Sequence, residues 1–202
     1  LILILTLTLI LIRVWRPQNL VEFKTDIISE KVTSGEITEF VIKYQAREDL
    51  SHNSISFNWP NNFIFESIDP SVNFNTETNT VLLNDLPEGA NGEIKVRGRV
   101  LGAIGERQDI FFFFNCDVCP DGLVESLVYN IEASALKTNW QLPELVYRGV
   151  EFKTKVELEN TGDFDFKNIT LTSVDGFKII SGFNTPLNLS PGEKREMELT
   201  LI

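Results

Sequence analysis

The stretch EIKVRGRV, residues 93–100, alternates charged side chains with apolar or small ones. Successive side chains of a β-strand point to opposite faces of its sheet, so this period of two predicts a strand with one face on a core and one in solvent. Stretches of similar character lie upstream, as in ITEFVIKY (37–44) and SISFNW (54–59), and turn residues separate them. Antiparallel sheets with one solvated face show this pattern.

Residues 18–115 contain about seven such stretches, which predicts one antiparallel β-sandwich. A second series of strand-like stretches occupies residues 124–202 and includes the long alternating stretch 149–160. Residues 116–123, with two cysteines, Pro120 and Gly122, interrupt the pattern, and we interpret them as a linker. After Pro17 no stretch has the period of an amphipathic helix. The predicted fold is therefore all-β.

The two series match each other, which indicates one module used twice. Three pairs of segments correspond: Gly35 and its strand with Gly149 and its strand, Phe63–Ser67 with Phe177–Ser181, and Leu83–Gly89 with Leu187–Glu193. In this alignment the second copy has no counterpart of Ile110–Phe114. We therefore expect the second sandwich to lack its last strand, unless residues beyond 202 or another chain supply it.

These segments resemble a known group of modules. Ser34-Gly35-Glu36 before a Phe- and Tyr-rich strand, followed by Leu86-Pro87-Glu88-Gly89, resembles the conserved-repeat Ig-like modules of bacterial and archaeal surface proteins. Glu157–Gly162 is similar to the related cell-adhesion-type bacterial module. The resemblance covers about residues 20–202 and implies a membrane-tethered, extracytoplasmic Ig-like array with structural or adhesive roles and no enzyme activity.

The chain begins with LILILTLTLILI, residues 1–12, followed by Arg13, Trp15 and Arg16. An apolar stretch that ends in cations and an indole is typical of a membrane helix reaching the headgroup layer, so we expect residues 1–17 to form a short transmembrane anchor. Leu1 to Trp15 would contact lipid or other hydrophobic helices. As a helix this stretch is about 22 Å long. A helix that spans a bilayer needs about 20 residues, or about 30 Å, so we expect this helix to begin upstream.

Other interpretations of residues 1–12 stay open. A helix packed against copies of itself in a filament core would also be apolar all round, and a buried strand is a further alternative. A signal-peptide core is disfavoured because no small-residue cleavage site follows. Arg13 and Arg16 alone would place the downstream side in the cytoplasm, whereas the resemblance places the β-domains outside the cell.

The charge balance and the scarcity of histidine exclude several functions. With 29 acidic and 18 basic residues the net charge is −11, which opposes binding to nucleic acid. The single His52 makes a histidine-based metal site or a Ser-His-Asp triad difficult to assemble. No P-loop, dinucleotide fingerprint or G-x-S-x-G is present. We expect no enzyme, no cofactor and no resident metal.

Cys116 and Cys119 form a lone C-x-x-C. A zinc site needs about four ligands and a thioredoxin-like motif needs a βαβ context, and the sequence predicts neither. We favour a local disulfide formed in an oxidising compartment, which would stiffen the joint between the two sandwiches. Two unreactive thiols, or a redox or metal role, remain as alternatives.

Phe111, Phe112, Phe113 and Phe114 are consecutive. A strand alternates its faces, so two of the four should enter the sandwich interior, while the other two need a second cover. At roughly 25 cal/mol per Å² of apolar surface, two uncovered Phe side chains forgo several kcal/mol. We expect the second sandwich or a neighbouring subunit to cover them, and the alternative is a locally exposed patch.

The remaining polar motifs have plain interpretations. Asp163 and Asp165, with Glu157 and Glu159, could supply oxygen ligands to Ca²⁺, but their spacing is not that of an EF-hand, and solvated turn charges are favoured. Asn168-Ile169-Thr170 and Asn188-Leu189-Ser190 match the glycosylation acceptor pattern. Trp59 and Trp140 are expected in the cores of their sandwiches.

Two functional hypotheses follow from the sequence. The first is a non-enzymatic, membrane-anchored cell-surface protein that displays Ig-like modules as a structural or adhesive stalk or scaffold. The second is a subunit of an extracellular filament or envelope assembly that packs through its hydrophobic N-terminal segment. Both predict protein partners or self-assembly.

Overall fold

The computed structural model describes residues 20–71, 73–119, 122–171, 176–183 and 186–202. All regular elements in these residues are β-strands, so the predicted all-β class is confirmed for the described part of the chain. No helix there combines the length and the hydropathy needed to cross a bilayer. The predicted anchor, residues 1–17 with Arg13, Trp15 and Arg16, lies outside the described residues.

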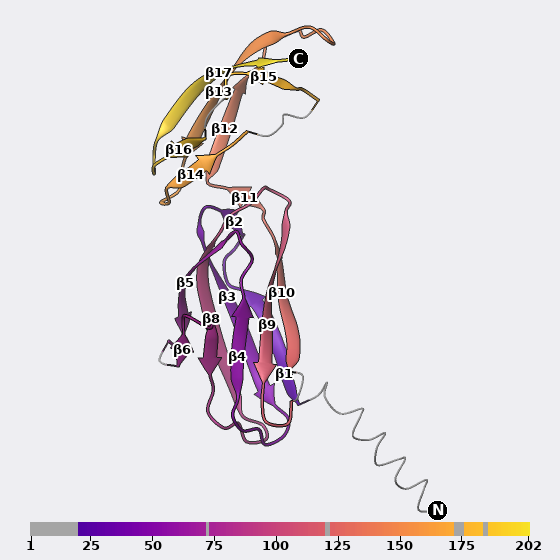
Figure 1. Ribbon diagram of the computed structural model, residues 1–202, viewed down its shortest axis with the longest axis vertical. Coiled ribbons are helices and arrows are strands. Elements are labelled where there is room, and N and C mark those ends of the chain that lie inside the picture. The colour runs from indigo at the N-terminus through magenta and orange to yellow at the C-terminus, as the bar shows by residue number, and fades with distance from the viewer. Residues whose placement is uncertain (1–19, 72, 120–121, 172–175, 184–185) are drawn as a thin grey trace, which may run out of the picture.

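The first sandwich consists of a four-stranded and a five-stranded antiparallel sheet (Figure 1). The four-stranded sheet has the order β1 (Val21–Ile27), β3 (Ile37–Ala46), β8 (Asn91–Val100) and β5 (Phe63–Asp69). The five-stranded sheet has the order β10 (Leu123–Asn130), β9 (Arg107–Asn115), β4 (Ser54–Asn58), β7 (Thr80–Leu82) and β6 (Phe74–Asn75).

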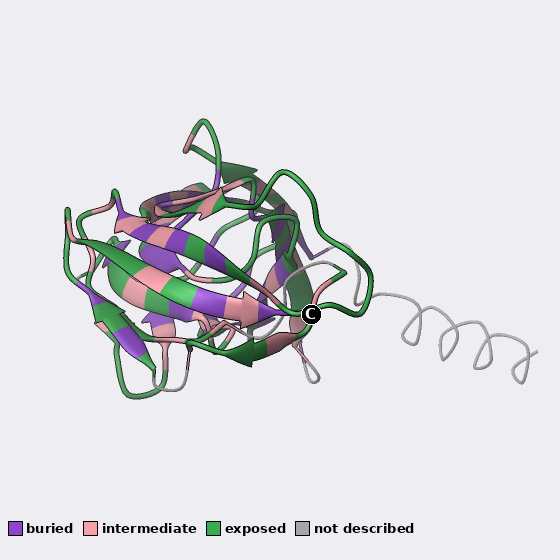
Figure 2. Cartoon of the chain, turned by 90° about the horizontal axis from the view of Figure 1, so that it is seen from above, coloured by how far each residue is buried: buried purple, intermediate pink, exposed green. Residues whose placement is uncertain are grey.

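Alternation along the strands builds the core between these sheets. In β8, Ile94, Val96 and Val100 are buried, as the pattern of residues 93–100 predicts. Figure 2, seen from the end that carries the second sandwich, shows buried, intermediate and exposed residues alternating along the strands. Gly98 also faces the core, where a Cβ would overlap the ring of Phe63, so the strand needs a residue without a side chain at this point.

The second sandwich repeats part of this arrangement. Its larger sheet has the order β12 (Leu136–Gln141), β13 (Phe152–Asn160), β17 (Lys194–Leu201) and β15 (Ile179–Ser181). Its smaller sheet pairs β14 (Phe166–Ile169) with β16 (Leu187–Leu189). The buried core is small and consists of Val156, Leu158, Leu187, Leu189, Leu199 and Leu201.

The predicted boundary between the sandwiches is wrong. Residues 116–123 are not a domain linker, because they form the connection between β9 and β10, which pair along their whole length from Leu123↔Phe114 to Asn130↔Arg107. Leu127, Tyr129 and Ile131 are buried in the first core, although the sequence assigned them to the second sandwich. A hairpin connection and a domain linker share the same polar, Gly- and Pro-containing composition, which explains the error.

The two sandwiches stack end to end along the long axis of the molecule (Figure 1). At the junction, β2 (Thr33–Ser34) pairs in parallel with β11 (Ala133–Ser134), which leads into β12. The amide of Ala135 donates to the carbonyl of Ser34 at 2.8 Å, and the amide of Thr161 donates to the carbonyl of Ala135 at 2.8 Å. The connecting segment is therefore hydrogen-bonded to both sandwiches.

Candidate interaction surfaces

Arg99, near the end of β8, joins the two sandwiches. Its Nη1 donates to the carbonyl of Gly35 and to Oδ1 of Asp163, both at 2.7 Å, and its Nη2 lies 3.3 Å from Oε1 of Glu66. Its guanidinium carbon lies 4.9 Å from the centroid of the Phe164 ring, within range of a cation–π contact. Only 7% of Arg99 is exposed, so these contacts are made largely out of water.

A glycine and an aromatic ring complete this joint. Gly35 has φ +88°, a conformation that side chains disfavour, and a Cβ there would overlap the ring of Phe166 from the second sandwich. Phe166 in turn packs edge-to-face against Phe164, with ring centroids 5.8 Å apart. The joint is thus held by a buried cation, an aromatic pair and backbone hydrogen bonds, a combination that restrains bending between the sandwiches.

The four consecutive phenylalanines lie on β9 and divide between its faces. Phe112 and Phe114 are fully buried, and both pack against Phe23 of β1 with ring centroids 5.3 and 5.7 Å apart. Phe111 points outward and is 42% exposed. The expectation that the second sandwich covers the outer pair is therefore wrong for Phe111, because that sandwich stacks on the end of the first rather than on its face. Cover by a neighbouring subunit stays a prediction.

Other apolar side chains share this outer face of the five-stranded sheet. Val124 pairs with Phe113 across β10 and β9 and is 56% exposed, and Leu82 of β7 is 60% exposed. We call the set Leu82, Phe111, Phe113, Val124 and Val128 the outer apolar patch. Exposed apolar side chains that gather on one sheet face are candidates for a surface that meets a partner.

Cys116 and Cys119 are joined by a disulfide within the turn between β9 and β10. The amide of Asp117 in this turn donates to the carbonyl of Ser51 at 3.2 Å, so the turn is attached to the loop before β4. This position is at the opposite end of β9 from the joint. The expectation that the disulfide stiffens the connection between the sandwiches is therefore wrong.

His52 and Ser51 both contact this turn through Asp117. Nδ1 of His52 lies 2.7 Å from Oδ2 of Asp117, and the hydroxyl of Ser51 donates to the same oxygen at 2.9 Å. Both groups meet one carboxylate oxygen, so His52 does not bridge Asp117 and Ser51 as the histidine of a catalytic triad would. The hydrogen bond and the charge of Asp117 raise the pKa of His52, and the bond to His52 lowers the pKa of Asp117.

We expect Asp117→Asn to lower the pKa of His52 toward its ordinary value of about 6.5, because the variant removes the carboxylate that favours the imidazolium. In the native protein the imidazolium contact stabilises the fold fully below the unfolded-state pKa of His52 and is lost as the pH rises through the higher folded-state pKa. Titration of the His52 ring protons by NMR measures both values. Asp85→Asn, which removes the charge with the smaller effect on His52, should shift the pKa less, and an unchanged pKa in Asp117→Asn would refute the contact.

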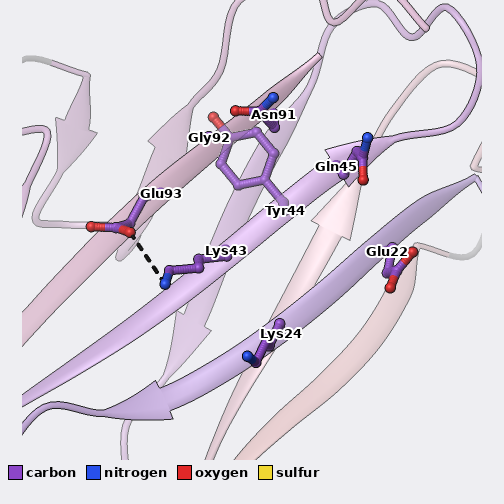
Figure 3. A pocket seen from close by; sticks show the side chains of 8 residues that line it. All are labelled: Glu22, Lys24, Lys43, Tyr44, Gln45, Asn91, Gly92 and Glu93. Carbon is purple, nitrogen blue, oxygen red and sulfur yellow. Dashed lines mark ion pairs between the residues drawn. The ribbon is translucent and has the colours of Figure 1, made fainter. Parts of the chain in front are cut away.

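A polar hollow of about 380 Å³ lies on the four-stranded sheet of the first sandwich, over β1, β3 and β8 (Figure 3). Its polar lining residues are Glu22, Lys24, Lys43, Gln45, Asn91 and Glu93. Figure 3 shows Lys43 directed toward Glu93, and their charged atoms lie 3.8 Å apart. Tyr44 also lines the hollow, and burial raises the pKa of its hydroxyl. Glu22 forms an ion pair with Arg47. Charges of both signs are therefore paired around this hollow, which favours a solvated sheet surface over an anion-binding site.

The loop between β12 and β13 exposes several apolar side chains at the far tip of the second sandwich. Leu145 and Tyr147 are each 66% exposed, Val150 is 54% exposed and Leu142 is 52% exposed. Gly149, the counterpart of Gly35 in the internal repeat, lies in the same loop, where a Cβ would meet no atom within 4 Å. Among the residues that the structure describes, none covers the surface of the second sandwich that corresponds to the joint of the first. This apolar loop was not among the sites predicted from the sequence.

Two of the four acidic residues considered for Ca²⁺ form ion pairs with basic side chains. Asp163 binds Arg99, and Glu159 lies 3.1 Å from Nζ of Lys194. Within the described residues no three His, Cys, Asp or Glu side chains gather into a metal-binding group. Asn168 and Asn188 of the two acceptor tripeptides are exposed on the paired strands β14 and β16, and the amide of Asn168 donates to Oδ1 of Asn188 at 2.9 Å.

Both tryptophans in the described residues pack on their own cores. Trp59 stacks on Phe57 with ring centroids 4.7 Å apart, and Trp140 is half-buried against the second core. Arg99 is the residue that sequence reasoning missed. Its place in the alternation of residues 93–100 predicts an outward, solvated side chain, and only the buried joint shows its role.

Comparison with known proteins gives no family. No family model matches the sequence, and no curated protein matches it. Among solved structures, AvmM, which catalyses macrocyclization in alchivemycin A biosynthesis, is 14% identical with a TM-score of 0.41, over 64% of this chain and 94% of its own. BslA, a bacterial hydrophobin, is 12% identical with a TM-score of 0.40, over 56% of this chain and 94% of its own.

A larger protein also appears among the similar structures. A variant of Salmonella alpha-2-macroglobulin is 10% identical with a TM-score of 0.36, and the match covers 92% of this chain but only 14% of the macroglobulin. These likenesses are too distant to indicate a function for this chain.

Proposed function

We propose that this chain is a non-enzymatic, membrane-anchored protein that holds two tandem Ig-like modules outside the cytoplasmic membrane as a stiff spacer or scaffold. The observation that carries the proposal is the joint around Arg99, where one buried guanidinium contacts Gly35, Glu66 and Asp163 at once. A flexible linker would let the modules turn independently, whereas this joint fixes their relative orientation. Such an arrangement suits a protein that displays a surface at a set distance.

Three further features agree with this function. The larger sheets of both sandwiches have corresponding strand orders, β1-β3-β8-β5 and β12-β13-β17-β15, as expected of one module used twice. The apolar residues 1–12, followed by Arg13, Trp15 and Arg16, supply the anchor in this proposal. The disulfide of Cys116 and Cys119 suits an oxidising compartment outside the cytoplasm.

The exposed apolar side chains favour a second candidate, a subunit of an extracellular filament or envelope assembly. The tip loop with Leu145 and Tyr147 and the outer apolar patch with Phe111 are two separate apolar surfaces of one chain. Two different surfaces that meet each other in neighbouring copies generate a ring when the rotation closes and an open filament when it does not. Monomers after detergent extraction favour the spacer, and ordered polymers favour the assembly subunit.

The test reconstitutes the 202-residue chain into liposomes with spin labels at Glu125→Cys and Lys137→Cys, one exposed position in each sandwich. We expect the labelled chain to float with the lipid and to give one narrow distance distribution between the labels. Leu5→Asp/Leu9→Asp, which places two charges in the apolar stretch, should stay with the soluble fraction. A broad distance distribution would refute the stiff spacer, and flotation of the charged variant would refute the proposed anchor.

A further inference from the structure

The outward face of the four-stranded sheet in the first sandwich is densely charged. Strand pairing brings its outward side chains side by side, and acidic and basic residues alternate across β1, β3 and β8. They include Lys24, Asp26, Glu39, Lys43, Glu93 and Arg97. A face of this kind suits contact with water.

The outward face of the five-stranded sheet has the opposite character. Along β9 from Phe111 to Asn115, and across onto β4, β7 and β10, no outward side chain is charged. The charged outward side chains of β9 itself, Arg107 and Asp109, lie at its joint end and pair with each other at 3.7 Å. The polar residues around the outer apolar patch are neutral: Ser54, Ser56, Asn58, Thr80, Asn115 and Ser126.

This contrast points to a contact surface. The chain has a net charge of −11, so an outward sheet face without charge is unusual for it. Loss of charged residues together with exposed aromatic side chains is the compositional signal of the centre of a protein interface. Phe111 is 42% exposed at the middle of this face, and Phe113 lies two residues further along the same strand.

The face is complete and lies open. All five strands of its sheet are in place, in the order β10-β9-β4-β7-β6, so it is not a gap left by a missing strand. The second sandwich stacks on the end of the first and does not reach this face (Figure 1). Neither described sandwich of the same chain therefore covers it.

The chemistry of the face selects a second copy as its occupant. It offers no charge that a basic or acidic partner could match. Its serine, threonine and asparagine side chains are each both donors and acceptors of hydrogen bonds, so the face is complementary to itself. Self-complementarity is what a two-fold contact requires, and two chains of net charge −11 repel each other least where neither carries a charge.

The size of the face indicates a weak contact. Four strands about 4.8 Å apart and seven residues at about 3.4 Å each give about 450 Å² per copy. Two such faces bury about 900 Å² in total, below the roughly 1,200 Å² at which stable complexes begin. We therefore expect a dissociation constant of about 10–100 µM. Unfolding measured at about 1 µM then reports single chains.

We propose that the outward face of the five-stranded sheet is a two-fold interface, at which two copies of this chain pack sheet against sheet with Phe111 and Phe113 at the centre. Sheets that pack in this way lie about 10 Å apart with their side chains interdigitated. The contact closes after two chains because the same face is used by both copies. It thus differs from the assembly through two different surfaces, and it depends neither on the proposed anchor nor on the stiffness of the joint.

The test is sedimentation equilibrium of the 202-residue chain over a series of concentrations from about 1 to 300 µM. Leu5→Asp/Leu9→Asp is the background for all proteins, because the two charges oppose association through residues 1–12. The native sequence in detergent micelles is measured in parallel. We expect both to change from monomer to dimer across the series, with no larger species.

Two variants with the same new side chain provide the matched control. Phe111→Lys places a charge at the centre of the proposed interface, opposite the same charge of the other copy, and the variant folds because Phe111 is already partly in water. Ile64→Lys places that charge on the outward face of the four-stranded sheet, at a residue that is 38% exposed. We expect Phe111→Lys to weaken dimerisation at least tenfold and Ile64→Lys to leave it within about twofold.

Three results would overturn the proposal. A chain that stays monomeric at 300 µM has no such interface, and sedimentation of that monomer with insoluble chitin or cellulose would assign the face to a neutral polysaccharide. A dimer that Phe111→Lys leaves intact uses another surface. Equal weakening by both variants would make net charge, rather than this face, the cause.

Discussion

Phe112→Ala is expected to lower the free energy of unfolding by about 3–5 kcal/mol, the usual cost of removing a fully buried aromatic side chain. Phe112 has no exposed surface, and its ring lies within 5.3 Å of Phe23 and 6.4 Å of Phe57, centroid to centroid. The alanine would leave a cavity between the two sheets of the first sandwich, which rigid strands on both sides cannot close. Urea denaturation of the two proteins measures the difference.

The neighbouring Phe111 is the matched control, because it has the same side chain and the same strand but the opposite face. Phe111→Ala should change the free energy of unfolding by less than about 1 kcal/mol, since Phe111 is already 42% exposed. Similar losses in both variants would show that the outer face of β9 is covered in solution, for instance by another subunit. A larger loss at Phe111 than at Phe112 would contradict the orientation of β9.

Arg99→Met should cost about 2–3 kcal/mol and uncouple the two sandwiches. The variant keeps the apolar stem but leaves the carbonyl of Gly35 and the carboxylate of Glu66 without their charged donor at the joint. Because Asp163 is largely exposed, its loss of a partner adds little. In calorimetry we expect the native chain to unfold with coupled transitions and the variant to show the second sandwich melting separately at a lower temperature.

Arg97→Met serves as the control for this experiment, two residues earlier on the same strand and exposed. It removes an equal charge without touching the joint, so its unfolding profile should match that of the native protein. If Arg97→Met separated the transitions as well, net charge rather than the joint would explain the effect. If neither variant did, the packing of Phe166 on Gly35 and the backbone pairing of β2 with β11 would be enough to couple the sandwiches.

The strands of the first sandwich could be predicted from the sequence because their alternation is local. Ile94 and Val96 are buried as their positions require, and the Phe111–Phe114 run divides between two faces. The repeat also predicted a second sandwich short of one strand; within the described residues β14 pairs with β16, and the missing strand stays a prediction.

The predictions that failed concern contacts between segments distant in the sequence, and local patterns do not encode such contacts. Residues 116–123 have the composition of a linker, but whether β10 turns back onto β9 or starts a new module depends on where Leu127 and Tyr129 find a core. Arg99 alternates like a solvent-facing residue, and only the arrival of the second sandwich buries it. The exposed tip loop went unnoticed because its apolar residues follow neither period.

The end-to-end stacking has a mechanical consequence. Leu20 accepts a hydrogen bond from Arg47, so the chain enters the first sandwich at the end away from the joint, and β17 carries it through the second. A force applied between the start of β1 and the end of β17 acts nearly parallel to the strands. Separating β1 from β3 under this force requires that their backbone hydrogen bonds break together in shear. Tension along two sandwiches stacked end to end is therefore shared among many hydrogen bonds between strands, whereas a force perpendicular to the strands would break them one at a time.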